Sequence, residues 1–518
     1  MENFTDEQTE SFEKPESIKN LRLWQMIFLG KGSLVRQILH AVISITLRLF
    51  FRRIEAANVE KVPPSGAIIF VLNHPNGLVD PALVFVSLIR RVSFLAKSTL
   101  FDIPIGGWLL RQFEILPVFR RVDAAGEMSK NRQTFENCYE LLAQGRCIAI
   151  FPEGISHDET KLQPLKTGAA RIALGALGVR NLEGASQKSE VRNQNSIFNI
   201  QDCDEIQNPE SKIQNRENKL RADGLKIMAV GLYYTSKSAF RSEALIRYGE
   251  IFDVAPVDLE ADGEPPREAV LELTGKIENA LKEVTLNLES ASELDAVLTA
   301  EALFSSVYEN LIFKQTLTQT FRRLQNLAKK YTLLERNDPQ KMHELNAKVT
   351  RYENELKKSG VTTESLSVLQ HPARYVFRYL ILRVAVLLLL APFAVAGAII
   401  HSPAYLFSNF IGLMFKTHGA DAAGSTYKIL AALVFMPLTW LITALLILYF
   451  FGWQFALASI PLTILCGYIA LRSSETLIDM RVWIKSTRLL FRQRALFLRL
   501  LVRRETLRQE ISEIIEKE

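Results

Sequence analysis

A histidine and an aspartate stand close together in the stretch Asn73–Pro81, with five residues between His74 and Asp80. The apolar run Ala67–Leu72 before it is typical of a short buried strand. Asp80 and Pro81 indicate a helix start, because aspartate suits the N-cap and proline the first turn. A histidine in a strand-to-helix loop near a carboxylate is typical of a general base and the group that orients it. The alternative is that Asp80 only caps the helix and His74 is an ordinary loop residue.

Three later stretches also place polar groups at strand-to-helix loops: Glu114–Arg121, Phe151–Asp158 and Leu162–Gly168. Arginine suits bidentate phosphate binding, and a lysine beside a helix N-terminus adds a point charge there. Each of these residues also has a purely structural explanation. The arginines and the lysine can be solvated surface charges, and Glu153 can be a local cap or an ion-pair partner. The candidate substrate-binding residues are Asn73, Arg120, Arg121, Glu153, Gly154, Ser156 and Lys166.

Residues 63–248 alternate short apolar runs with helical stretches. The predicted strands are Ala67–Leu72, Val92–Ala96, Ile115–Val118, Cys147–Phe151, Leu225–Leu232 and Ala244–Arg247. The predicted helices are Pro81–Arg90, Ile105–Phe113, Gly126–Gln144 and Gly168–Leu177. This alternation predicts an α/β fold with a mostly parallel sheet and flanking helices, whose sites form in the loops after the carboxyl ends of the strands.

Composition excludes several classes of protein. A net charge of +6 over 518 residues is modest and does not indicate a nucleic-acid-binding protein. The four cysteines show neither metal spacing nor a disulfide framework, so we expect no metal and a reducing compartment. No Gly-rich dinucleotide fingerprint follows a strand, and the polar N-terminus does not resemble a signal peptide.

The chain divides by composition into six parts. We expect a disordered tail (1–33), an amphipathic membrane-associated helix and linker (34–62), and a catalytic domain (63–260) with a polar disordered insertion (181–224). A helical region (261–372), a transmembrane region (373–471) and a basic cytoplasmic tail (472–518) follow. In the helical region we expect helices over Glu268–Leu288, Ala300–Lys330 and Lys341–Lys358.

The helix expected at Leu34–Phe51 has an apolar stripe opposite Gln37, His40, Ser44 and Arg48. Such a helix suits the membrane interface, and the alternative is that the stripe packs on the domain core. His40 is expected to be a polar-face residue and not a ligand.

Ile429–Leu471 contains no charged residue, which is typical of membrane-crossing helices. Crossings are expected at Val384–Ile400, Ile429–Phe451 and Phe455–Leu471, with Tyr405–Phe415 as a short or re-entrant segment. The basic tail should face the cytoplasm with the catalytic domain, which requires an even number of crossings. Leucines of the tail, from Leu489 to Leu501, could form another surface-lying helix.

In this order, the motifs resemble those of the glycerolipid acyltransferase superfamily, over roughly Pro63–Gly249. His74 and Asp80 match its histidine–aspartate motif, Arg120 its arginine motif, and Glu153, Gly154 and Ser156 its Phe-Pro-Glu-Gly motif. Gly231 falls in its late apolar strand, where Ala229 stands in place of a frequent proline. The five-residue spacing, the Leu-Lys-x-Gly stretch and Phe240-Arg241-Ser242 are similar to the subgroup of glycerol-3-phosphate and dihydroxyacetone-phosphate acyltransferases.

The resemblance implies a membrane-bound O-acyltransferase of phospholipid biosynthesis. His74 would be the general base, Asp80 would orient it, and Arg120 with Lys166 would bind the phosphate of the acceptor. No cofactor is expected beyond the acyl-CoA or acyl-carrier protein that donates the acyl group, and membrane lipids are the expected surroundings. The alternatives are a 1-acylglycerol-3-phosphate acyltransferase that makes phosphatidate, and a non-catalytic lipid-binding membrane protein.

Overall fold

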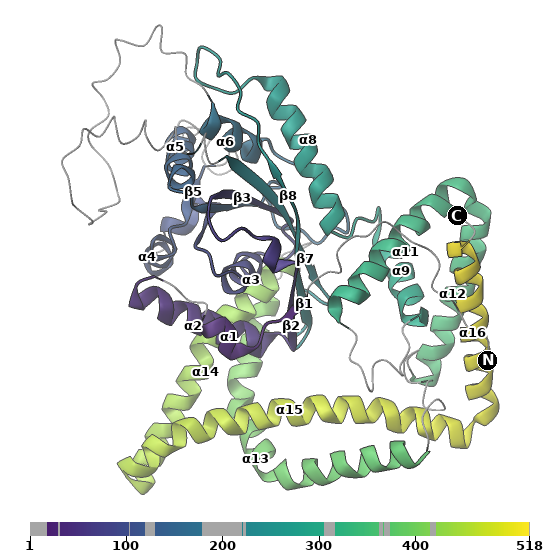
Figure 1. Cartoon of the computed structure of the whole chain (residues 1–518). Coiled ribbons are helices and arrows are strands. Elements are labelled where there is room, and N and C mark those ends of the chain that lie inside the picture. The colour runs from purple at the N-terminus through teal and green to yellow at the C-terminus, as the bar shows by residue number, and fades with distance from the viewer. Residues whose placement is uncertain are drawn as a thin grey trace.

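The chain folds into an α/β domain, a helical bundle beside it and a set of long apolar helices beneath both (Figure 1). A computed structural model describes residues 18–28, 32–102, 104–119, 130–178, 220, 224–304, 316–361, 366, 373–414 and 421–516. Most of the insertion expected at 181–224 therefore lies outside the described residues, and its disorder stays a prediction.

The described part of the α/β domain contains one eight-stranded sheet, in the order β1-β2-β8-β7-β3-β6-β4-β5. Its strands are β1 (Ile18–Asn20), β2 (Arg53–Ala57), β3 (Ala67–Leu72), β4 (Val92–Lys97), β5 (Leu116–Val118), β6 (Cys147–Ile150), β7 (Leu225–Tyr234) and β8 (Glu243–Asp253). The pairs β1·β2 and β7·β8 are antiparallel and the other pairs are parallel. The predicted α/β class with a mostly parallel sheet is therefore confirmed.

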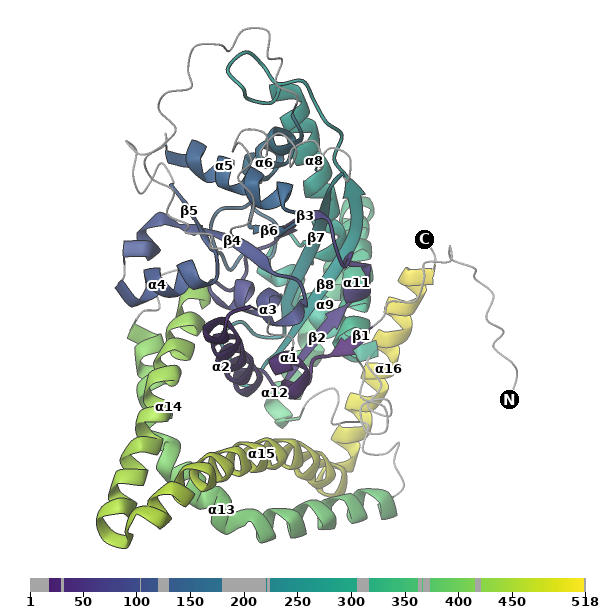
Figure 2. The same cartoon turned by 60° about the vertical axis from the view of Figure 1, so that its left-hand side comes forward.

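Helices cover both faces of the sheet (Figures 1 and 2). One face carries α1 (Leu23–Phe28), α2 (Leu34–Phe50) and α3 (Val79–Ser87), and the other carries α5 (Lys130–Ala143), α6 (Gly168–Leu177) and α8 (Arg267–Val284). All six residues of β3 are buried, as expected for a central parallel strand covered on both sides. The helix α4 (Pro104–Gln112) and the short 3-10 helices η1 (Val59–Lys61) and η2 (Ser98–Asp102) lie in the connections.

Two boundaries of the α/β domain differ from the prediction. The expected tail 1–33 and the linker after the first helix contain β1, α1 and β2, which belong to the sheet layer. The strand β2 lacked an apolar signal because it carries Glu55, which is buried, pairs with Arg53 at 3.4 Å and accepts from the Thr318 backbone at 3.1 Å. Burial raises the pKa of this carboxyl. At the other end, α8 packs on the sheet and is not part of a separate helical region, since an apolar stripe predicts burial but not the partner.

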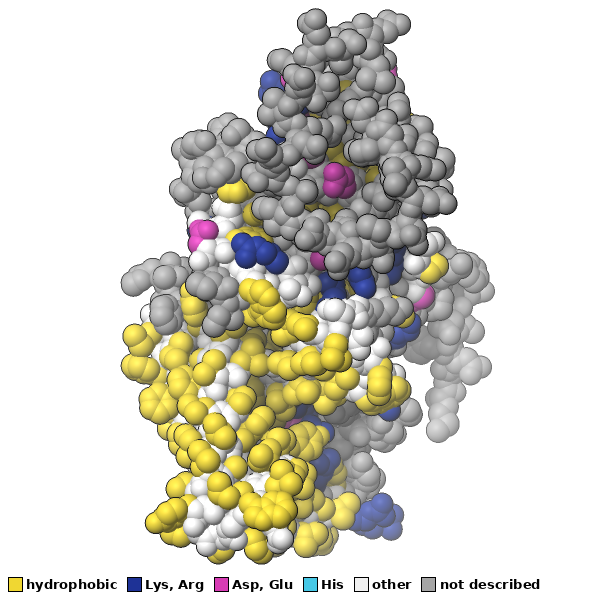
Figure 3. All heavy atoms as spheres, turned by 90° about the vertical axis from the view of Figure 1, so that its left-hand side faces the viewer, with side chains coloured by type: hydrophobic (Ala, Val, Ile, Leu, Met, Phe, Trp, Pro, Cys, Tyr) yellow, Lys and Arg dark blue, Asp and Glu magenta, His cyan; other side chains and the backbone are white. Residues whose placement is uncertain are grey.

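The face of α2 that packs on the domain carries three of its polar residues together with Leu47 and Phe50, whereas most of the apolar stripe is exposed. Arg36, His40 and Ser44 are buried, and the Arg36 guanidinium lies over the ring of Phe85 at 5.3 Å. Leu34 and Ile38 are 72% and 54% exposed on the opposite side. Most of the stripe is therefore available to a lipid surface, and core packing holds only for Phe50 at its end. Figure 3 shows hydrophobic side chains gathered over the lower part of this face of the molecule.

The helical bundle consists of α9 (Ala291–Phe304), α11 (Leu317–Asn337), α12 (Pro339–Ser359) and the C-terminal α16 (Arg494–Glu516). Leu303, Val349, Tyr352 and Leu356 share one buried core with Phe497, Leu500, Leu507 and Ile511. The predicted continuous helix Ala300–Lys330 is wrong, because Thr316 caps the start of α11 in a capping box with Gln319. The leucines of the tail do not form a separate surface-lying helix, because most of them pack in this core.

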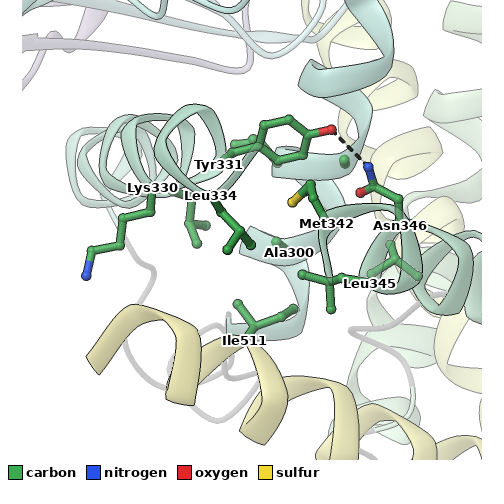
Figure 4. A pocket seen from close by; sticks show the side chains of 12 residues that line it. Ala300, Lys330, Tyr331, Leu334, Met342, Leu345, Asn346 and Ile511 are labelled. Atoms are coloured by element: carbon green, nitrogen blue, oxygen red, sulfur yellow. Dashed lines mark hydrogen bonds between the residues drawn. The ribbon is translucent and has the colours of Figure 1, made fainter. Parts of the chain in front are cut away.

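A small apolar cavity of about 50 Å³ lies inside this bundle (Figure 4). It is lined by α9, α11, α12 and Ile511 of α16, and the Asn346 amide donates to the Tyr331 hydroxyl at 2.9 Å beside it. None of these elements carries His74 or Asp80, so the cavity is not part of the candidate site.

Three described helices are long and apolar enough to cross a membrane: α13 (Ala373–Met414), α14 (Asp421–Phe451) and α15 (Trp453–Arg492). The predicted break between Val384–Ile400 and Tyr405–Phe415 is wrong, because α13 continues through Pro392 and Pro403. Neighbouring helices stabilise such prolines in a membrane. Trp440 of α14 donates to His401 of α13 at 2.9 Å, and the imidazole bonds in turn to the Gly397 carbonyl at 2.9 Å.

The β7–β8 connection joins the α/β domain to these helices through Arg241. Its guanidinium forms an ion pair with Glu475 of α15 and donates to the Arg48, Leu49 and Phe51 carbonyls at the end of α2, at 3.0–3.2 Å. The Arg241 and Glu475 side chains are 13% and 10% exposed. One arginine therefore caps α2 and fixes α15 against the domain.

Replacement of Arg241 by glutamine is expected to lower the free energy of unfolding by about 2 kcal/mol, because it removes one of the two arginines that pair with Glu475 and takes a donor from three carbonyls. Thermal unfolding of the purified protein in detergent micelles measures this loss. The matched control is Lys226→Gln, which removes an exposed ion pair with Asp253 and should change stability by less than about 1 kcal/mol. Equal melting temperatures for the two variants would show that Arg241 is not a structural junction.

Candidate active site

His74 and Asp80 meet at the carboxyl end of β3. His74 Nδ1 lies 2.8 Å from Asp80 Oδ2, so the five-residue spacing permits direct contact. The loop turns at Gly77, whose φ of +51° is unfavourable for other residues, and α3 begins at Val79, two residues before the predicted start. Asp80 lies inside the helix, and its Oδ2 accepts from the Asn76 backbone at 2.7 Å. The interpretation of Asp80 as a cap alone is therefore wrong.

The Asp80 carboxylate is completely buried and fully hydrogen-bonded. Its second oxygen, Oδ1, accepts from the Tyr234 hydroxyl at 2.5 Å. A buried carboxylate needs donors of this kind to remain ionised. Burial and the adjacent Asp80 raise the pKa of Tyr234 well above its usual value, so this hydroxyl keeps its proton.

The imidazole of His74 is held in one orientation and stays partly open. Its side chain is 19% exposed, and its ring stacks on Phe151 with 4.1 Å between the centroids. The Asp80 contact favours the tautomer with a proton on Nδ1, which leaves Nε2 as a proton acceptor. Among the described residues no side chain or carbonyl forms a hydrogen bond with Nε2. The geometry is that of a general base oriented by a carboxylate.

Glu153 connects the loop of His74 to the loop of Gln163 through hydrogen bonds. It is 2% exposed, and its carboxylate accepts from the His74 backbone at 2.9 Å and the Gln163 backbone at 2.8 Å. Its Oε2 also lies 2.5 Å from His157 Nε2. The carboxylate is thus engaged by protein groups, and its predicted contact with acceptor hydroxyls stays a prediction.

Gly154, Ser156 and Lys166 lie beside the histidine loop. Ser156 Oγ accepts from the Gly77 backbone at 2.9 Å. Gly154 has a φ of +70°. A Cβ added there would clash with Lys166 Nζ, so the Lys166 ammonium group lies directly against the backbone of this glycine. The structure therefore gathers these three predicted residues around His74, Asp80 and Glu153.

Of the remaining predicted site residues, the structure describes Asn73 but not Arg120 or Arg121. The Asn73 side chain bridges to β7, donating to the Leu232 carbonyl at 3.0 Å and accepting from its backbone nitrogen at 2.8 Å. Asn73 thereby fixes the end of β3 against β7. Arg120 and Arg121 lie outside the described residues, so their role in phosphate binding stays a prediction.

Sequence reasoning gave no role to Tyr234, His157 or Lys237, which all contact this site. Tyr234 follows Met228, Val230 and Leu232 on one buried face of β7, and a buried tyrosine hydroxyl in that pattern signals a polar partner. Lys237 donates to the His157 carbonyl at 3.2 Å.

No group of three or more His, Cys, Asp or Glu side chains suited to a metal occurs in the described part of the chain.

Two family models match the chain. Residues 53–183, which contain the histidine and glutamate loops, match the Acyltransferase family. Residues 302–518 match the family described as Glycerol-3-phosphate acyltransferase 2 C-terminal domain. The α/β part of the chain is therefore similar to acyltransferases, and the predicted resemblance to the glycerolipid acyltransferases is confirmed.

Individual relatives agree with these matches. Glycerol-3-phosphate O-acyltransferase 2 of Saccharomyces cerevisiae is 25% identical over 335 residues, which cover 62% of this chain and 39% of the yeast protein. Glycerol-3-phosphate O-acyltransferase 1 of the same yeast is 24% identical over 499 residues, covering 77% of this chain and 59% of the yeast protein. The chain thus spans less than two-thirds of the length of either yeast protein.

Two further similarities cover smaller shares of the chain. The chloroplastic 1-acyl-sn-glycerol-3-phosphate acyltransferase LPAT1 of Arabidopsis thaliana is 29% identical over 124 residues, which cover 24% of this chain and 33% of the plant protein. The crystal structure of the 1-acyl-sn-glycerophosphate acyltransferase PlsC from Thermotoga maritima is 16% identical, covers 51% of this chain and 86% of its own, and has a TM-score of 0.29.

Proposed function

We propose that this chain is a membrane-bound O-acyltransferase that moves a fatty acyl group from a thioester to a hydroxyl of glycerol-3-phosphate or dihydroxyacetone phosphate. The observation that carries the proposal is the 2.8 Å contact between His74 Nδ1 and Asp80 Oδ2, which leaves Nε2 as a base at the mouth of the site. The match of residues 302–518 to a glycerol-3-phosphate acyltransferase domain supports the choice of acceptor.

In the proposed reaction, His74 Nε2 accepts the proton of the acceptor hydroxyl as its oxygen attacks the thioester carbonyl. An oxygen–carbon bond forms, the carbon–sulfur bond breaks, and the thiolate leaves. Asp80 stabilises the imidazolium, which then returns the proton to the thiolate. The step requires no covalent acyl-enzyme. Among the described residues the imidazole of His74 forms a hydrogen bond only with Asp80, and no Ser, Cys or Lys side chain bonds to it as a nucleophile would.

The acceptor phosphate is proposed to bind Arg120 or Arg121, with Lys166 contributing a second positive charge. Lys166 is exposed beside Gly154 at the end of the loop that leads into α6, directly before the N-cap Thr167, so a phosphate can approach both the ammonium group and the helix N-terminus. The acyl donor is proposed to be acyl-CoA or acyl-carrier protein. No cofactor is proposed.

The second candidate acceptor is 1-acylglycerol-3-phosphate, which would give phosphatidate. It is favoured by the similarity of about a quarter of the chain to plant 1-acyl-sn-glycerol-3-phosphate acyltransferases. A non-catalytic lipid-binding protein is a weaker alternative, since the histidine–aspartate contact and its supporting hydrogen bonds are intact.

A panel of acceptors decides between these candidates. Purified protein in vesicles is given acyl-CoA and either glycerol-3-phosphate, dihydroxyacetone phosphate or 1-acylglycerol-3-phosphate, and the lipid products are identified by mass. We expect the highest kcat/KM with glycerol-3-phosphate or dihydroxyacetone phosphate. A preference for the acylated acceptor would establish the second candidate, and no product with any acceptor would favour the non-catalytic alternative.

The membrane topology is proposed from the ends of the apolar segment. The chain leaves the bundle core after Leu366 and returns to it at Phe497 of α16, and α9, α12 and α16 share that core. Both ends of the α13–α15 segment therefore lie on one side, which supports an even number of complete crossings. Thr426, in the first turns of α14, accepts from the Leu78 backbone at 3.3 Å, and Asp479 of α15 pairs with Arg52 at 3.4 Å. The hairpin of α14 and α15 is thus the proposed pair of crossings, with the α/β domain on the cytoplasmic face.

Three single cysteines test this topology in a Cys203→Ser background. Gln454→Cys, in the first turn of α15, should react with an impermeant maleimide from one side of sealed vesicles. His343→Cys on α12 and Arg508→Cys on α16 should react only from the other side. Labelling of the last two from opposite sides would contradict an even number of crossings.

A further inference from the structure

Tyr234 connects the histidine–aspartate pair to the buried face of the sheet. It is the last residue of β7 and is 8% exposed. Its ring packs against Phe51 at the end of α2, with 5.7 Å between the centroids. The ring is thereby fixed in the core, and its hydroxyl points to the buried carboxylate of Asp80.

The hydroxyl supplies a hydrogen bond that no other described residue replaces. Asp80 Oδ2 accepts from the Asn76 backbone and contacts His74 Nδ1, whereas Oδ1 accepts from Tyr234 at 2.5 Å. We propose that Tyr234 is a positioning residue, which holds the Asp80 carboxylate in the orientation that directs Nε2 of His74 toward the acceptor. This inference rests on the proposed acyl transfer.

Removal of the hydroxyl would change the orientation of Asp80. Oδ1 would become a buried acceptor without a donor among the described residues, and the carboxylate could rotate away from Nδ1. A misdirected carboxylate would hold Nδ1 of His74 less well, so Nε2 would be directed less firmly toward the acceptor. The other titratable groups near the imidazole and its loop are Glu153, His157 and Lys166, with Lys237 and Asp158 beyond His157, and the substitution leaves all of them unchanged.

Tyr234→Phe tests the inference, because it removes only the hydroxyl. We expect kcat to fall about tenfold, as for loss of a hydrogen bond to a charged group, with the KM of both substrates changed less than about twofold. These parameters are measured on the full-length protein in vesicles with acyl-CoA and glycerol-3-phosphate.

The matched control is Tyr248→Phe on the neighbouring strand β8. Its hydroxyl is equally buried and lies 2.7 Å from Ser87 Oγ, but it does not contact His74 or Asp80. This variant should keep the wild-type kcat, and its thermal stability corrects for the loss of a buried hydroxyl. Equal effects of the two substitutions on kcat would assign Tyr234 a purely structural role.

Two further outcomes separate this inference from the proposed function. If Tyr234→Phe folds and keeps the wild-type kcat while His74→Ala is inactive, the positioning role is wrong and the proposed function stands. If His74→Ala retains wild-type activity, the mechanism itself is wrong, and the positioning role fails with it.

Discussion

Replacement of His74 by alanine is expected to lower kcat for acyl transfer about a thousandfold, because general-base catalysis commonly contributes factors of this size. The imidazole is the one group of the described site whose nitrogen is both oriented by a buried carboxylate and open to an acceptor hydroxyl. The contact of its Nδ1 with Asp80 fixes the orientation of the ring. Steady-state kinetics with saturating acyl-CoA and glycerol-3-phosphate measures the loss.

The control for this substitution is His343→Ala, which removes an exposed histidine from α12 and should leave kcat unchanged. The His74 variant should keep the wild-type melting temperature to within a few degrees, because the Glu153 carboxylate bonds to the His74 backbone, which alanine retains. A folded His74→Ala protein with near-normal turnover would rule out His74 as the base.

Replacement of Asp80 by asparagine is expected to lower kcat about a hundredfold or more, since loss of the orienting carboxylate disturbs the histidine tautomer. The carboxylate accepts from the Asn76 backbone on one oxygen and from the Tyr234 hydroxyl on the other. An amide has one oxygen and one NH₂ group, so it must lose an acceptor at one of these positions. It also lacks the negative charge that stabilises the imidazolium.

The split between kcat and KM distinguishes this cause from general damage. Loss of the orienting carboxylate should lower kcat with little change in the KM of either substrate. Asp253→Asn, at an exposed carboxylate of β8, is the matched control and should leave kcat unchanged. An Asp80→Asn enzyme with wild-type kcat would remove the orienting role.

The sequence identified the centre of the α/β domain well because its signals are local. The strand β3 and the helix α6 have the predicted bounds, since a continuous apolar run and a small-residue helical stripe leave few alternatives. The contact of His74 with Asp80 was also predictable, because the two residues are six positions apart at one strand-to-helix junction. The edge strands β1 and β2 were not, since their short, charged segments become strands only through pairing and through the partners of Glu55.

Contacts between distant segments account for the rest of the site. Tyr234 lies 154 positions after Asp80 in the chain, so the bond between them appears only when β7 pairs with β3. The sequence also could not predict which face of α2 packs on the domain, because a stripe of leucine and isoleucine indicates burial in protein and in lipid equally well. Only the packing of Arg36 and His40 against the domain shows which face of that helix is left exposed.

The most direct test of the account is the reaction itself, carried out by purified wild-type protein and by His74→Ala in identical vesicles. With acyl-CoA and glycerol-3-phosphate, the wild-type protein should release CoA and form acylated glycerol-3-phosphate in equal amounts, and the variant should form neither above background. Equal product formation by the two proteins would contradict the account, as would release of CoA by the wild-type protein without any acylated acceptor.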